Sequence, residues 1–201
     1  MSIRNIANVS LCLALLSVGN GVAAQNESRW HNVDINQQNR EPRRAAFFAY
    51  ETLDKAQSFD KKKSVNYLSM EGMWKFNFVK DYNKRPANFF ALKYDDSQWK
   101  DFPVPGLFEL NGYGDATYKN IGYAWATQFD PNPPYISELN NYTGSYRRTF
   151  TVPADWKDRR IVICCEGVIS FYYIWVNGHM LGYNQGSKTP AEWDITDYVQ
   201  E

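Results

Sequence analysis

Residues 171–183, FYYIWVNGHMLGY, hold the strongest local fold signal in the chain. Aromatic and β-branched residues fill the first six positions, and Asn177 and Gly178 follow at once. An Asn-Gly pair suits both central positions of a type I′ turn, whose twist matches that of the two strands it joins. The stretch therefore predicts a β-hairpin that turns at Asn177 and Gly178.

Strand-like patterns recur on both sides of this segment. Large aromatic residues alternate with polar ones in GMWKFNFV, residues 72–79, which is the period of a strand with one buried face. Tyr146, Phe150 and Val152 share one face of a second predicted strand. Residues 160–168, RIVICCEGV, are apolar on both sides and predict a central strand. Short strands with almost no helical period predict an all-β antiparallel sandwich.

The first 66 residues differ from the rest. Residues 1–24 combine Arg4, an apolar run and a small-residue end, which are the features of a signal peptide. The apolar run is shorter than the roughly 20 residues that cross a bilayer, and no later segment comes closer, so we predict no membrane span. We expect a secreted or periplasmic protein in which residues 25–66 form an extended arm over a β-sandwich domain, residues 67–201.

Charge and cysteine content narrow the function classes. The chain has 22 basic and 22 acidic residues. Loss of the leader removes Arg4 and no acid, which leaves a net charge of about −1 and makes nucleic acid an unsuitable partner. Cys164 and Cys165 are neighbours that point to opposite faces of a strand, so they do not bridge each other. Aromatic residues make up 16% of the chain, which fits a β-rich core or a surface that stacks on sugars.

No self-contained catalytic constellation is visible in the sequence. His31 and His179 are the two histidines, and no Cys or His spacing supports a zinc site. Carboxylates are plentiful, but the sequence selects no pair at the roughly 5–10 Å that a glycosidase needs. Glu166 and Asp194 are expected to anchor turns by accepting backbone hydrogen bonds. We therefore assign no catalytic residue and no metal ligand.

An aromatic loop, YKNIGYAW at residues 118–125, holds the candidate sugar contact. The amide of Asn120 could both donate to and accept from sugar hydroxyls. Composition alone favours an amide that satisfies the local backbone. Tyr123 and Trp125 of the same loop offer aromatic faces that a free-standing carbohydrate-binding module could use.

Taken together, a series of motifs resembles the N-terminal region of a large β-galactosidase of glycoside hydrolase family 2. The resemblance covers roughly residues 40–201 in unbroken order. The motifs are REPRRA (40–45), YLSMEGMWKFN (67–77), FPVP (102–105), NGYG (111–114), YKNI (118–121), GSYRRTF (144–150), WVNG (175–178) and GYNQGSKTPAEWDI (182–195). In that family the region is a jelly-roll, galactose-binding-domain-like sandwich that precedes an immunoglobulin-like domain and a (β/α)8 barrel.

The resemblance implies a division of roles within a retaining glycosidase. The family's acid/base and nucleophile glutamates lie in the barrel, so it implies no catalytic residue here. The family's Tyr-x-Asn-[Val/Ile] loop lends an asparagine to the galactose pocket, and by position that residue is Asn120. The full-length family often uses Mg and Na and is homo-oligomeric, while no cofactor is implied in this chain.

The implied function is the non-catalytic sugar-binding domain of an enzyme that hydrolyses terminal β-galactosides. Its partners would be a β-galactoside-like carbohydrate and the rest of the parent enzyme. A free-standing secreted carbohydrate-binding module is the alternative, and a small enzyme that uses its own carboxylates is a third hypothesis.

Two stretches depart from the family pattern. PGLF (105–108) stands where Pro-Ser-Asn-Trp is usual, and NIGYA (120–124) stands where Asn-[Val/Ile]-Thr-Tyr-Pro is common. Both lie near the loop that meets the sugar, so the resemblance does not extend to strict galactose specificity. The chain stops at Glu201, before the family's next strand, so we expect a truncated sandwich, incomplete at its C-terminus. Such a fragment should be marginally stable alone and expose a sheet edge.

Overall fold

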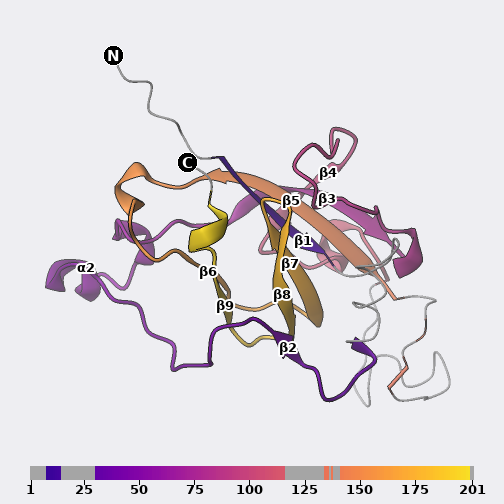
Figure 1. Ribbon diagram of the computed structural model, residues 1–201, viewed down its shortest axis with the longest axis horizontal. Helices are drawn as coiled ribbons and strands as arrows, with labels where there is room; N and C mark the ends of the chain where they lie inside the picture. The colour runs from indigo at the N-terminus through magenta and orange to yellow at the C-terminus, as the bar shows by residue number, and fades with distance from the viewer. Residues whose placement is uncertain (1–7, 15–29, 116–133, 136, 138–140, 200–201) are drawn as a thin grey trace.

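Two antiparallel β-sheets dominate the computed structural model, which describes residues 8–14, 30–115, 134–135, 137 and 141–199 (Figure 1). The larger sheet has seven strands in the order β2-β8-β7-β1-β5-β3-β4, and β6 pairs with β9 in a second sheet. The strands are β1 (Asn8–Ala14), β2 (Gln37–Gln38), β3 (Gly72–Val79), β4 (Lys100–Val104), β5 (Thr143–Thr151), β6 (Val162–Cys165), β7 (Phe171–Val176), β8 (His179–Gln185) and β9 (Ala191–Asp194). The predicted all-β antiparallel sandwich is confirmed.

The predicted hairpin is formed by β7 and β8. Val176 lies opposite His179, and the two residues between them, Asn177 and Gly178, have φ angles of 48° and 83°. Positive φ at both central positions is what a type I′ turn requires. The local sequence thus fixes the turn and the register next to it.

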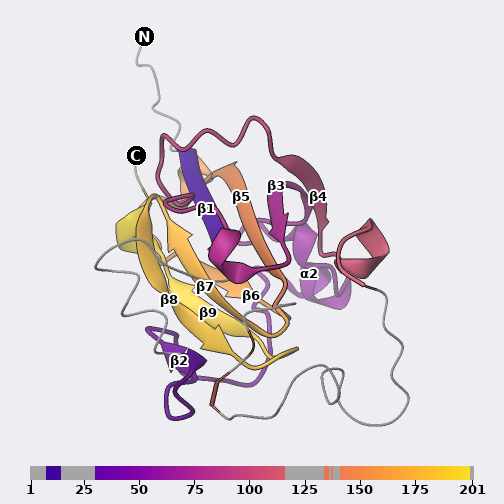
Figure 2. The same cartoon turned by 90° about the vertical axis from the view of Figure 1, so that its right-hand side faces the viewer.

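Both faces of the larger sheet are covered, which explains why β7 is apolar throughout. On one face Ile174 and Val176 pack with Trp74 and with Trp193 of β9. On the other face a second apolar cluster surrounds β7 and β8: Trp30, Tyr82, Phe89, Tyr173, Trp175 and Tyr183. The β6–β9 pair therefore covers one face of the sheet, and the segments around Trp30 and Phe89 cover the other (Figure 2).

The prediction of a central strand at residues 160–168 is wrong. β6 is shorter, Val162–Cys165, and its only strand partner among the described residues is β9. Only one of its faces packs on the core: Ile163 is buried, whereas Val162 is 39% exposed and Cys164 is also exposed. An apolar run on both faces does not distinguish a central strand from a short edge strand whose outer face is apolar.

The segment between residues 30 and 66 runs along the sandwich beside β8 and β9. β2 pairs with β8, with Gln37 opposite Asn184, and the amide of Glu41 donates to the carbonyl of Glu192 at 2.8 Å. A five-residue helix, α2 (Leu53–Gln57), begins after the cap Thr52, whose hydroxyl accepts from the amide of Lys55. Elements this short give no periodic signal in the sequence.

Residues 8–14, inside the predicted leader, form strand β1 between β5 and β7. The export prediction for residues 1–24 stays a prediction. Among the described helices, none combines the length and the apolar character needed to cross a bilayer.

Candidate functional site

Asn120, the predicted sugar contact, lies outside the described residues, as do Tyr123 and Trp125. The structure does describe Asp115 and Tyr142, which lie on either side of this part of the chain. The Tyr142 hydroxyl donates a hydrogen bond to the Asp115 carboxylate. This side-chain bond therefore links the part of the chain just before the residues that contain Asn120 to the part just after them.

Lys80, just after β3, completes the contact. Its Nζ lies 3.7 Å from Asp115 Oδ1 and 5.6 Å from the centre of the Tyr142 ring. The hydrogen bond to Asp115 raises the pKa of Tyr142 to about 12, and the same bond, with the charge of Lys80, lowers the pKa of Asp115. We call Lys80, Asp115 and Tyr142 the loop-base cluster. Sequence analysis missed it because its members are far apart in the chain and match no motif.

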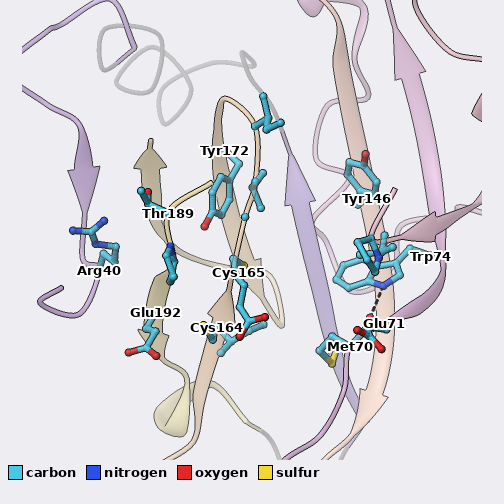
Figure 3. A pocket seen from close by; sticks show the side chains of 18 of the residues that line it. Arg40, Met70, Glu71, Trp74, Tyr146, Cys164, Cys165, Tyr172, Thr189 and Glu192 are labelled. Atoms are coloured by element: carbon cyan, nitrogen blue, oxygen red, sulfur yellow. Dashed lines mark hydrogen bonds between the residues drawn. The ribbon is translucent and has the colours of Figure 1, made fainter. Parts of the chain in front are cut away.

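A cavity of about 1980 Å³ lies between the sheets. Figure 3 shows Trp74 and Tyr146 on one side of it and Tyr172 and Cys165 on the other. The indole of Trp74 donates to the carbonyl of Met70 at 2.9 Å, the dashed line in Figure 3. The lining combines aromatic faces with many polar and charged groups, Arg40 and Glu192 among them.

The thiols and phenols that line this cavity stay neutral near neutral pH. The Cys164 side chain is exposed, but loss of part of its hydration and the nearby charges of Glu192 and Glu166 raise its pKa to about 11. Burial raises the pKa of Cys165 to about 12, so neither thiol supplies a thiolate near neutral pH. Burial also raises the pKa values of the Tyr146 and Tyr172 phenols. The cavity can contact a ligand through aromatic faces and hydrogen bonds, but these four groups provide no activated nucleophile.

Glu166 and Glu192, which line the cavity, each pair with a cation. Glu192 accepts two hydrogen bonds from Arg44, at 2.6 and 3.0 Å. Asp194 accepts from the amide of Thr196 at 3.0 Å, so the prediction that it anchors a turn is confirmed. The same prediction for Glu166 is wrong, because its bonded partner is the Lys61 ammonium at 2.6 Å.

Comparison with known proteins decides the family. Residues 67–201 match the family described as "Glycosyl hydrolases family 2, sugar binding domain". The chain belongs to glycoside hydrolase family 2. The resemblance found from the motifs is thereby confirmed.

Several relatives of this family 2 chain are β-galactosidases by name. It is 39% identical over 171 residues to the "Beta-galactosidase" of Priestia megaterium, a match that covers 85% of this chain and 16% of the relative. It is 36% identical over 176 residues to the "Beta-galactosidase" of Halalkalibacterium halodurans, covering 88% and 17%. It is 37% identical over 145 residues to the "Beta-galactosidase large subunit" of Leuconostoc lactis, covering 66% and 23%. The chain thus spans between about a sixth and a quarter of these relatives.

The family 2 resemblance implies Mg and Na for the full-length enzymes, so we tested whether this chain gathers metal ligands. Among the described residues, no group of three or more His, Cys, Asp or Glu is placed to hold a metal ion. His31 stacks on Trp30 at 4.3 Å between ring centres, and His179 lies 5.6 Å from Tyr198. The described residues do not fit a metal site.

Removing the Tyr142 hydroxyl should loosen the loop base of this family 2 domain. The bond lies at the surface, where water and salt weaken contacts to charged groups, so its loss should act locally and not on the stability of the whole domain. We expect Tyr142→Phe to speed limited proteolysis within residues 116–140 about fivefold, with a change in Tm below about 2 °C. Tyr50→Phe, whose ring packs on Phe48, is the matched control. Equal proteolysis rates in both variants would contradict the proposed role of the hydroxyl.

Asp194 should make the stability of the domain sensitive to acid. Hydrogen bonds from Thr196, and then from Arg160, lower the pKa of Asp194 to about 2. Because the folded pKa lies below the unfolded value of about 3.9, the stabilisation is present above pH 4 or so and is lost as pH falls through about 2. Asp194→Asn should therefore melt below the wild type at about pH 6, and the difference should close near pH 2.

The control for this pH experiment is Asp197→Asn, a neighbouring exposed position. Its melting temperature should track the wild type at both pH values. A difference between wild type and Asp194→Asn that is the same at both pH values would refute the assignment to the Asp194 carboxylate.

Proposed function

We propose that this chain is the non-catalytic sugar-binding domain of an enzyme that hydrolyses terminal β-galactosides. The match of residues 67–201 to the family's sugar binding domain carries the proposal. The names of the relatives supply the substrate class. The ion pairs of Glu166, Glu192 and Asp194 support a binding role, because each carboxylate is already engaged by a Lys or Arg side chain.

Within this function we propose that Asn120 contacts the sugar. Its amide can donate to one hydroxyl and accept from another, which suits the alternating donors and acceptors of a pyranose ring. The loop-base cluster supports this role, since it fixes the positions of Asp115 and Tyr142 on either side of the loop. A held loop loses less conformational entropy on binding than a free one.

The proposal is tested by titrating the full 201-residue chain with β-galactosides and following chemical shifts by NMR. We expect millimolar affinity, because one loop supplies only part of a sugar pocket. Asn120→Ala should weaken binding by about tenfold, whereas Gln98→Ala, an amide on an exposed turn, should leave it unchanged. Binding that is insensitive to Asn120→Ala would reject the assigned role.

A free-standing carbohydrate-binding module makes different predictions. Such a module should bind a polysaccharide with roughly micromolar affinity and lose it on Trp125→Ala, because stacking on an aromatic face would dominate. Hydrolysis of a nitrophenyl galactoside by the purified chain would contradict both binding functions and favour an enzyme that uses its own carboxylates.

We further propose export of the protein and a homo-oligomeric parent enzyme. The features of residues 1–24 support export to the periplasm or the medium. N-terminal sequencing of protein recovered from the exported fraction tests this, and an intact Met1 there would contradict cleavage. Light scattering of the full-length enzyme tests the oligomeric state.

A further inference from the structure

One corner of the cavity between the sheets is polar. It is formed by Arg40, Arg43 and Tyr172, which all line the cavity and which we call the corner cluster. Arg40 donates from Nη1 to Asn184 Oδ1 of β8 at 2.9 Å. Arg43 lies beside the turn that follows β8, since a Cβ at Gly186 would be 3.6 Å from its Nη2. The corner cluster therefore joins β7 to the chain that crosses β8.

The two arginines of the corner cluster have no acidic partner among the described residues. No ion pair there includes Arg40 or Arg43. Burial, and then the charge of Arg43, lower the pKa of Arg40, so the two guanidinium groups repel each other. The carboxylates of the same region are engaged by other cations: Glu41 and Asp194 by Arg160, Glu192 by Arg44, and Glu166 by Lys61.

The Tyr172 hydroxyl is a buried donor without a partner of normal geometry. Tyr172 is 2% exposed, and its hydroxyl, like Arg40 Nε, makes no hydrogen bond within the described part of the chain. The neighbouring Cys165 thiol is only a weak donor and acceptor. Burial raises the pKa of the phenol and the charge of Arg40 opposes the rise, so the two groups lie close together. In Figure 3 the hydroxyl points to the side of the cavity where Arg40 and Thr189 lie.

We propose that the corner cluster binds an oxyanion, the carboxylate or sulfate of an acidic sugar. A guanidinium group donates paired N–H bonds to such an anion, and these charge-assisted bonds are about twice as strong as neutral ones. The phenol adds a further donor. The anion neutralises the repulsion between Arg40 and Arg43 and gives an acceptor to two buried donors that otherwise have none.

The rest of the cavity suits a sugar ring attached to the anion. Its volume of about 1980 Å³ exceeds the roughly 300–1,000 Å³ of ordinary ligand pockets, so a bare ion would leave most of it empty. Trp74, Tyr146 and Phe171 line it and offer aromatic faces of the kind that stack on sugars. The choice of a sugar rests on the proposed sugar-binding function, whereas the oxyanion contact rests on the corner cluster alone.

The test compares three probes, galacturonate, galactose 6-sulfate and neutral galactose, by NMR titration of the full 201-residue chain at constant ionic strength. We expect at least one acidic sugar to bind about tenfold or more tightly than galactose, because galactose lacks the charged acceptor. The two acidic probes show whether the corner cluster prefers a carboxylate or a sulfate. Acidic sugars that bind no more tightly than galactose would overturn the proposal.

Variants of Arg43 separate recognition by the corner cluster from a general effect of net charge. Arg43 is exposed, so its replacement should leave the fold intact. We expect Arg43→Met to weaken the acidic sugar about tenfold and Arg43→Lys about threefold, because lysine keeps the charge but not the paired donors. Lys100→Met is the matched control, since Lys100 lies on β4, at the edge of the larger sheet opposite to β2. Equal weakening in Arg43→Met and Lys100→Met would overturn the proposal.

Tyr172→Phe tests the buried hydroxyl and keeps the ring. Without ligand its Tm should not fall, because no hydrogen bond of normal geometry is lost. The affinity for the acidic sugar should fall about fivefold, because the anion loses one donor. Unchanged affinity would overturn the proposal, whatever the Tm.

Failure of this proposal is distinguishable from failure of the sugar contact at Asn120. If both proposals hold, Asn120→Ala weakens binding of the neutral galactoside, while Arg43→Met leaves that binding unchanged. Galactoside binding that depends on Asn120, with no preference for an acidic sugar, would overturn the oxyanion site alone.

Discussion

Arg147→Met is expected to lower the free energy of unfolding by about 3–5 kcal/mol. The Arg147 side chain is 8% exposed, and its Nε lies 2.7 Å from Asp96 Oδ2. Its guanidinium also donates to the carbonyls of Phe89 and Ala91. A methionine would fill most of the volume but would leave a carboxylate and two carbonyls without this donor, and such groups are costly when removed from water.

The measurement is chemical denaturation followed by tryptophan fluorescence. Lys75→Met is the matched control, since Lys75 lies directly opposite Arg147 on β3 and pairs with Asp101 at 3.0 Å. The Lys75 side chain is 40% exposed, so losing its ion pair should cost less than about 1 kcal/mol. Equal losses in the two variants would show that burial does not set the strength of the Arg147 contacts.

Gly182→Ala is expected to destabilise the domain by about 2 kcal/mol and to lower Tm by roughly 4–8 °C. A Cβ at position 182 would overlap the carbonyl oxygen of Gln38 and lie 2.8 Å from Trp193 Nε1. That carbonyl accepts a hydrogen bond from the Trp193 indole at 3.3 Å. The added methyl would push the 30–66 segment away from β8 and break this bond.

Gly167→Ala is the control for Gly182→Ala, because a Cβ there would meet only an ordinary contact, Lys188 Cα at 3.8 Å. Differential scanning calorimetry of both variants gives the comparison. An unchanged Tm in Gly182→Ala would mean that Gln38 moves aside without loss, and that the close approach of the arm is not a constraint on the sheet.

The sequence predicted those features that depend on neighbouring residues. The turn at Asn177 and Gly178 follows from two adjacent residues, and the alternation in residues 72–79 follows from the pleat of one strand. The prediction of an all-β sandwich was based on several strand-like stretches of this kind. These local patterns predicted the fold class correctly because the apolar side chains of each strand must face one of the two apolar clusters.

Features that join distant segments were not predicted. A register shift occurs between Ile174 and Trp175, so Leu181 and Tyr183 pack in different clusters although they are two positions apart. Simple alternation would put both on one face. The bond between Arg147 and Asp96 likewise depends on a fold that brings together residues 51 positions apart.

In the candidate site, too, contacts between residues distant in the chain were not predicted. Asn120 was identified by its place in a family motif. The chemistry of the loop alone did not distinguish this residue from other amides. The loop-base cluster unites Lys80, Asp115 and Tyr142, and nothing in their separate surroundings indicated that they would meet. Glu166 was assigned to a turn because the sequence could not show that Lys61 lies beside it.

The place of β1 sets the order of events during synthesis. The ribosome makes this strand first, yet its partners come later by 131 positions (Ala14–Ser145) to 165 positions (Leu11–Val176). Pairings so distant in the chain are slow, because a long loop must close before any contact repays the lost entropy. β1 therefore cannot pair until most of the chain has been synthesised. During that time its apolar segment is free to bind other factors that recognise nascent apolar segments.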